Sequence, residues 1–112
     1  MKIKSYLARV MFTYRYAKGY DIGDGLAVVR QYKDLDPIKN SWCVIDIKSG
    51  CGIGISNHSS KKEALEFFEI RKLDLMPKIY KVRESDYYKK LCTELAEEKA
   101  LWRLSGYEFW HY

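Results

Sequence analysis

The stretch that decides the fold is residues 42–55, which read WCVIDIKSGCGIGI. Apolar residues recur at every second position on both sides of Ser49-Gly50, which is a turn signal. Alternation at period two is typical of half-buried strands, and two such runs around a turn predict a β-hairpin. We expect Asp46 and Lys48 on one face of this hairpin. The other face is predicted to carry the apolar set: Cys43, Ile45, Ile47, Cys51, Ile53 and Ile55.

Two glycines, Gly52 and Gly54, alternate with the isoleucines in the second half of this hairpin. An isolated glycine in a strand often marks a place where another chain segment or a ligand comes close. The sequence therefore predicts a close approach at this face. A neighbouring backbone and a bound ligand are both open as its cause.

The N-terminal third predicts two further strands. Residues 6–16 alternate in a way that puts one apolar face on a single strand, although a helical stripe through Leu7, Val10, Met11 and Tyr14 is the alternative. The glycine-rich residues 19–25 predict a loop, residues 26–32 a second strand, and residues 34–37 a turn before Pro37. The apolar face of the first strand is Tyr6, Ala8, Val10, Phe12, Tyr14 and Tyr16.

The C-terminal half predicts two helices. Ser60 and Glu63 have capping-box spacing, so we expect a helix from there to about Leu73 that ends before Met76-Pro77. Residues 79–82 are compatible with a short fifth strand. Ser85 is predicted to cap a second helix over about 86–104, with Gly106 beyond its end. The expected core stripe of this helix is Tyr88, Leu91, Cys92, Leu95 and Trp102.

These elements predict one α+β domain over residues 1–112. Its order is ββββα(β)α: an N-terminal, hairpin-built antiparallel sheet of four to five strands, covered on one face by two helices. The other face is expected to carry Arg9, Arg15, Arg30 and Asp46 together with some aromatic side chains.

Composition excludes several classes of protein. Ten Tyr, four Phe and three Trp in 112 residues are too many aromatics for a disordered chain. No apolar run is long enough to span a membrane, and the N-terminus lacks a secretory signal pattern. The cysteines Cys43, Cys51 and Cys92 are odd in number and lack CxxC spacing. We therefore expect a cytoplasmic protein without disulfides or membrane contact.

The formal charge of +5 is concentrated in two segments. Residues 1–40 hold eight Lys or Arg against four Asp or Glu, and residues 61–83 hold seven against four. A basic excess permits nucleic-acid binding without requiring it. One hypothesis is therefore a direct DNA- or RNA-binding module with a basic, aromatic surface. Its candidate contact residues are Arg9, Arg15, Arg30 and Lys33.

The sequence offers no strong catalytic signature. The glycine-rich residues 19–25 lack the Lys-Ser/Thr of a phosphate-binding P-loop. A small enzyme that uses Cys43 or His58, with Asp46 as orienting acid, is the third hypothesis, but the predicted hairpin puts Asp46 and the cysteines on opposite faces. His111 has no partner at ligand spacing. We predict no catalytic residues, no cofactor and no metal.

The aromatic surplus favours a binding function. Exposed Tyr and Trp are enriched at interface hot spots, and Tyr20, Tyr107, Trp110 and Tyr112 are the candidates here. The leading hypothesis is a non-enzymatic protein that occupies a surface of a protein or nucleoprotein partner, with a second copy of the chain as another candidate partner. In general character, though not in its residues, the chain is similar to small accessory proteins of phages and other mobile elements. That similarity implies an inhibitor.

Overall fold

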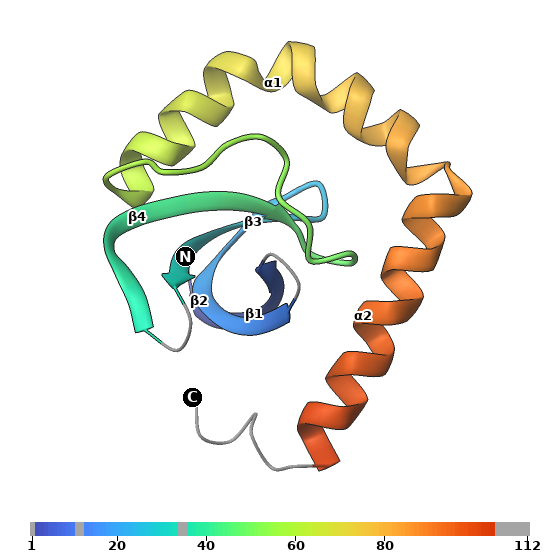
Figure 1. The fold of residues 1–112 in the computed structure, drawn as a ribbon. Helices are drawn as coiled ribbons and strands as arrows, with labels where there is room; N and C mark the ends of the chain where they lie inside the picture. The colour runs from blue at the N-terminus through green and yellow to red at the C-terminus, as the bar shows by residue number, and fades with distance from the viewer. Residues whose placement is uncertain (1, 11–12, 34–35, 105–112) are drawn as a thin grey trace.

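The computed structural model describes residues 2–10, 13–33 and 36–104, with side chains left out for 32–40. Figure 1 shows four strands followed by two helices. The bounds are β1 Ile3–Val10, β2 Thr13–Gly23, β3 Leu26–Lys33, β4 Asp36–Asp46, α1 Lys61–Arg83 and α2 Asp86–Leu104.

The four strands form one antiparallel sheet in the order β1-β2-β3-β4, so each strand pairs with its neighbours in sequence. The two helices pack against this sheet, and the predicted α+β class is confirmed. The sheet is strongly curled, and α1 and α2 follow its outside in one arc (Figure 1). None of the helices in the described part of the chain is long and apolar enough to cross a membrane.

The two faces of the sheet carry separate cores. We call the face that meets the helices the outer face and the opposite one the inner face. On the outer face, Ala64, Phe68 and Met76 of α1 pack on Leu26, Val28, Val44 and Ile55. Leu95 of α2 packs on Leu7 and Tyr16. The inner face carries mainly small residues, as a tight curl requires: Ala8, Ala17, Ala27, Val29 and Ile45.

The single strand predicted over residues 6–16 is wrong, because the chain reverses within it. β1 and β2 pair from Ile3↔Tyr20 to Val10↔Thr13, and residues 11–12 between them lie outside the described part. Residues that pair directly share a face. Tyr16 and Ala8 were predicted on the same face. Because the chain reverses between them, Tyr16 packs with Leu7 on the outer face, whereas Ala8 lies on the inner face. One continuous period-two pattern concealed two strands.

The loop predicted over residues 19–25 is mostly strand. β2 continues to Gly23, and only Asp24-Gly25 turn the chain into β3. Both residues have positive φ, 56° and 75°, as type I′ hairpin turns require. An Asp-Gly pair between apolar runs is the standard signal for this turn. The predicted strand over 26–32 is confirmed, at residues 26–33.

The segment after β4 returns along it without becoming a regular strand. The Val44 amide donates to the Ile55 carbonyl and the Asp46 amide to the Cys51 carbonyl, but the ladder is interrupted, and Gly54 has φ +88°. The predicted single apolar face is wrong for this second half. Ile53 and Ile55 pack on the outer-face core with α1, whereas Cys43, Ile45 and Ile47 belong to the inner face.

α1 is ten residues longer than predicted, because Pro77 does not end it. Residues 79–82, expected as a fifth strand, belong to this helix. A proline inside a helix removes one hydrogen bond to the carbonyl four residues earlier. Here that residue is Leu73, which is exposed like Pro77 itself. Water can therefore hydrate the released carbonyl, and the helix continues.

The predicted helix starts are confirmed. The Ser60 hydroxyl accepts the Glu63 amide at 3.0 Å, and the Ser85 hydroxyl accepts the Tyr88 amide at 3.1 Å. α2 has the predicted bounds, with Tyr88 and Leu95 buried. The Glu63 side chain departs from the capping box, because it bonds Ser59 and His58 instead of the Ser60 amide. Gly106 and the aromatic tail lie outside the described residues.

Two glycines of the sheet region provide a matched test of packing. A Cβ on Gly19 would lie 2.2 Å from the Val28 carbonyl oxygen, whereas a Cβ on Gly52 meets nothing within 4 Å. Because backbone atoms cannot move aside cheaply, Gly19→Ala should lower the free energy of unfolding by about 2 kcal/mol or more. Gly52→Ala should leave it nearly unchanged. Urea denaturation followed by circular dichroism measures both, and equal effects of the two substitutions would contradict this packing.

Candidate functional site

A hollow of about 410 Å³ opens on the inner face of the sheet. Its floor consists of small and apolar side chains of the strands, such as Ala8, Ala17 and Val29. Its wall includes the returning segment with Gly52, Gly54 and Ser56. Three of the four predicted nucleic-acid contacts, Arg9, Arg15 and Arg30, line it together. The side chain of the fourth, Lys33, lies outside the described part.

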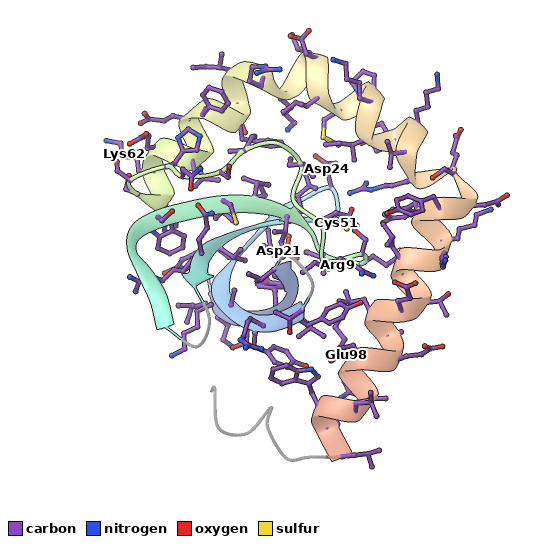
Figure 2. The ribbon with its side chains drawn as sticks, viewed as in Figure 1. Arg9, Asp21, Asp24, Cys51, Lys62 and Glu98 are labelled. Carbon is purple, nitrogen blue, oxygen red and sulfur yellow. The ribbon has the colours of Figure 1, made fainter. Side chains whose placement is uncertain are left out.

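Arg9 is a structural brace at the border of this hollow. Its Nε donates to the Ser49 carbonyl oxygen at 3.1 Å, and its Nη2 donates to the Leu91 carbonyl oxygen at 2.9 Å and to Glu94 Oε2 at 3.2 Å. Figure 2 shows Arg9 on the side of the curled sheet nearest α2. Its guanidinium also lies over the Tyr14 ring at 4.9 Å. Arg9 therefore joins β1 to α2, and its ion pair with Glu94 offsets part of the charge that it brings to the border of the hollow.

Arg30 is less engaged. Its Nε is buried and has no hydrogen-bond partner among the described residues, and its guanidinium carbon lies 5.8 Å from the centre of the Trp42 ring. A buried donor without a partner is unusual in a folded protein and calls for an acceptor. Arg15, from β2, donates to the Tyr14 carbonyl oxygen at 2.9 Å. Among the described residues that line the hollow, none is acidic.

The glycine wall of the hollow leaves space that the protein does not fill. Gly54 needs its glycine for conformation, because its φ is +88°. Gly52 has no positive φ and no neighbour within 4 Å of an added Cβ. The missing side chain at Gly52 is therefore explained by neither strain nor internal packing. It widens the hollow. No described atom lies within 4 Å of a Cβ added at Gly52 or Gly54, so a close approach of a neighbouring backbone is not found there, and a bound ligand stays a prediction.

Asp46 was expected on an exposed sheet face, but it is buried beneath the helices. Its Oδ1 accepts from Arg83 Nε at 3.1 Å and from Arg83 Nη2 at 2.9 Å. Its Oδ2 accepts from the Ser49 amide at 3.0 Å, the Ser49 hydroxyl at 2.7 Å and the Tyr88 hydroxyl at 2.8 Å. The carboxylate thus joins the β4 turn, the end of α1 and the start of α2.

The surroundings of Asp46 keep it charged. Burial alone would raise its pKa, but the hydrogen bonds from Ser49, Tyr88 and Arg83 outweigh burial and hold the pKa below its ordinary value. Burial and the hydrogen bond to Asp46 raise the pKa of the Tyr88 hydroxyl. The phenol therefore stays protonated and donates.

A second, mainly apolar groove of about 430 Å³ lies in the elbow between α1 and α2. Ile53, Leu75, Ile79 and Leu91 supply apolar walls, and Asp46 lies at its polar side. Each Asp46 oxygen already accepts at least two hydrogen bonds within the protein. That cluster is explained by its role in joining the helices, so we assign it a structural role.

The structure does not assemble the Cys–His–Asp site of the third hypothesis. His58 Nδ1 lies 3.1 Å from Glu63 Oε1, and its ring packs on Phe67 with centroids 4.9 Å apart. Cys43 packs on the inner face, where burial raises the pKa of its thiol to about 11. Asp46 is held by Arg83. Among the described residues, no group of His, Cys, Asp and Glu could hold a metal ion.

Of the predicted partner-binding aromatics, only Tyr20 lies in the described part. It is half-buried, stacks on Trp42 with ring centroids 6.4 Å apart, and carries the Lys61 ammonium 4.1 Å above its ring. Tyr20 therefore packs the start of α1 onto the sheet. The structure instead exposes Ile70, Leu73 and Tyr80 of α1. Their helical spacing was readable in the sequence, but Pro77 had been interpreted as the helix end.

Comparisons of the chain with protein-family models, with curated proteins and with solved structures find no match.

The Asp46 cluster gives a prediction for stability against pH. Because the folded-state pKa is depressed, the charged carboxylate stabilises the fold above its unfolded-state pKa of about 3.9, and this contribution is lost as the pH falls through the folded-state pKa. Asp46→Asn leaves Arg83 without its carboxylate, so the free energy of unfolding at pH 7 should fall by about 2–3 kcal/mol. Chemical denaturation between pH 7 and low pH measures both effects.

The matched control is Asp74→Asn, which removes an exposed carboxylate from α1. Its stability should follow the wild-type curve. The pKa of Glu63 is also lowered, by hydrogen bonds from Ser59 and His58, so wild type and control lose some stability in acid for that reason too. The Asp46→Asn curve should be flatter than both. Parallel curves for all three proteins would rule out the proposed role of Asp46.

Proposed function

We propose that the protein binds single-stranded nucleic acid, with the arginine-lined hollow of the inner sheet face taking up a phosphate-bearing nucleotide. The observation that carries this proposal is that Arg9, Arg15 and Arg30 all line one hollow, which no described acidic residue lines. Charged arginine donors favour phosphate oxygens, which accept charge-assisted hydrogen bonds. The role is one of binding, and no reaction is assigned.

The shape of the site favours a single strand over a duplex. A hollow of about 410 Å³ can receive one nucleotide, whereas duplex recognition uses a helix or ribbon that enters a groove. Binding of single strands combines a positively charged track for the backbone with surfaces on which bases pack. The basic excess over residues 1–40, a range that includes β1, β2, β3 and the first part of β4, supports such a track.

Arg30 provides the direct test. Arg30→Gln removes the unpaired buried donor and one positive charge, so the affinity for a fluorescent oligothymidylate should fall at least about tenfold, as expected for loss of one charge-assisted hydrogen bond. The slope of log affinity against log salt should also decrease by about one, because one phosphate contact is lost. Fluorescence anisotropy at several salt concentrations measures both quantities.

The control is Arg71→Gln, which removes the same charge from the exposed surface of α1. It should change the affinity much less than Arg30→Gln does. Competition with inorganic phosphate, a nucleoside monophosphate, single-stranded RNA and duplex DNA identifies which part of the ligand is recognised. Absence of oligonucleotide binding at low salt, or equal effects of the two substitutions, would falsify the proposal.

Gly52 provides a second test that leaves the charges intact. Gly52→Val places a branched side chain in the open space of the wall, so oligonucleotide affinity should fall at least about tenfold through steric exclusion, as one lost contact of about 1.4 kcal/mol would give. The free energy of unfolding should change little, because nothing lies within 4 Å of the added Cβ. Anisotropy and urea denaturation measure the two. Full binding by a folded Gly52→Val protein would place the ligand outside the hollow.

Two earlier expectations stay predictions. A protein or nucleoprotein partner, including the inhibitor function, was expected at Tyr20, Tyr107, Trp110 and Tyr112; Tyr20 is used in packing and the other three lie outside the described residues. We also propose a cytoplasmic location, which is supported by the free thiols of Cys43, Cys51 and Cys92.

A further inference from the structure

Among the described residues that line the hollow of the inner face, Gln31 carries the one side-chain amide. It belongs to β3 and is half-buried, two residues after Val29 of the inner-face core. The proposed phosphate contacts do not use it. Amide side chains form hydrogen bonds with the edges of bases, so Gln31 is a candidate for contact with the base of a bound nucleotide.

The orientation of this amide is fixed by two hydrogen bonds. Gln31 Oε1 accepts from the Ser41 hydroxyl at 2.7 Å and from the backbone amide of Asn57 at 2.7 Å. A backbone amide can only donate, so the atom that faces Asn57 has to be the oxygen of the Gln31 side chain. Both lone pairs of this oxygen are thereby occupied. Gln31 can offer a ligand only its Nε2 group, which donates.

This Nε2 group is a donor held in place. It has no hydrogen-bond partner among the described residues, whereas the oxygen of the same amide is held by Ser41 of β4 and by Asn57 of the returning segment. The two bonds restrict rotation of the side chain before any ligand arrives. A group that is already ordered loses little conformational entropy on binding, so this donor is suited to selecting among ligands.

The other polar side chains of the hollow also favour a ligand that accepts hydrogen bonds. Arg9, Arg15 and Arg30 can only donate. Burial raises the pKa of the Cys43 thiol to about 11, so this group keeps its proton. The Ser56 hydroxyl can donate or accept, and no described acidic residue lines the hollow. The side chains of the hollow therefore offer many donors and few acceptors.

Pyrimidine bases differ in the group that they present to such a donor. Thymine and uracil carry an oxygen at position 4, which accepts, whereas cytosine carries an amine at the same position, which donates. In a single strand this edge is open to the protein, because no partner strand occupies it. A protein donor that faces the amine leaves both groups without a partner, and polar sites reject ligands for this reason.

We infer that the hollow selects uracil and thymine over cytosine, with Gln31 Nε2 as the donor to the oxygen at position 4. The inference rests on the proposed binding of single-stranded nucleic acid and adds which pyrimidines that site accepts. The arginines cannot supply this selectivity, because the phosphate is the same in every nucleotide. Gln31 is therefore the specificity-determining residue of the hollow.

The test compares oligouridylate with oligocytidylate of equal length, which share one sugar-phosphate backbone and differ in the base edge. Fluorescence anisotropy at low salt measures the two affinities. Wild type should bind oligouridylate about tenfold more tightly, as expected when one donor is left unpaired in the weaker complex. This comparison needs no variant and therefore does not depend on how a substitution affects folding.

Gln31→Glu exchanges the donor for an acceptor at nearly constant shape. One carboxylate oxygen can keep the bonds from Ser41 and Asn57, and the other replaces Nε2 and can accept from the cytosine amine. The ratio of the oligouridylate to the oligocytidylate affinity should therefore fall about tenfold, to parity or below. The matched control is Arg30→Gln, which changes the net charge by the same one unit in the same hollow. It should weaken binding of both oligonucleotides and leave their ratio unchanged.

Gln31→Met is the second variant, because methionine has no donor, and it should bring the ratio close to one. Circular dichroism checks that each variant is folded. Equal wild-type affinities for the two oligonucleotides overturn the inference, as does a wild-type preference that both Gln31 variants retain. In either case, binding that Arg30→Gln weakens still supports the proposed function. Absence of binding to both oligonucleotides at low salt removes the proposed function and this inference with it.

Discussion

One buried carboxylate, Asp46, holds the architecture together. It ends β4, accepts hydrogen bonds from its own turn through Ser49, and binds Arg83 at the end of α1 and Tyr88 near the start of α2. A charge in this position is stable only because the protein supplies its partners. The same turn supplies the Ser49 carbonyl to Arg9, which braces β1 to α2. The placement of both helices and one border of the hollow therefore depend on a single side chain.

The two faces of the sheet differ in how far the chain itself fills them. The outer face is filled by helices and their core, and the buried Asp46 is paired there with Arg83. The inner face has small side chains on its floor, arginines at its border and a glycine at Gly52 where packing requires none. Arg30, whose Nε has no hydrogen-bond partner among the described residues, lines the same hollow. This asymmetry is the physical basis of the proposed binding site.

Local signals in the sequence predicted where helices begin better than they predicted which side of the sheet each strand residue faces. The helix caps at Ser60 and Ser85 depend on neighbours within three residues, and both were predictable. The alternation across residues 6–16 does not reveal that the chain reverses within it, although Val10 and Thr13 pair directly with each other. Pro77 was wrongly predicted to end the helix. Its exposure lets water hydrate the carbonyl that has lost its hydrogen bond, and exposure depends on tertiary structure, which the local sequence does not show.

The candidate site follows the same distinction. Residue type and the basic segment predicted Arg9, Arg15 and Arg30, and all three line the hollow although they come from three strands. The role of Asp46 could not be predicted, because its partners Arg83 and Tyr88 lie 37 and 42 residues away in the chain.

The closure of the sheet has a consequence for behaviour at high concentration. The returning segment after β4 forms backbone hydrogen bonds with β4, both as donor and as acceptor. The Gly50 carbonyl oxygen accepts a hydrogen bond from the Arg9 amide of β1 at 2.9 Å. A Cβ on Gly50, whose φ is +74°, would lie 2.9 Å from the Leu7 carbonyl oxygen, so this approach depends on glycine. Exposed strand edges are templates on which other chains can add strands, as in amyloid. This glycine-dependent seam occupies backbone groups of β4 and one amide of β1, and so shortens the strand edges on which another chain could pair.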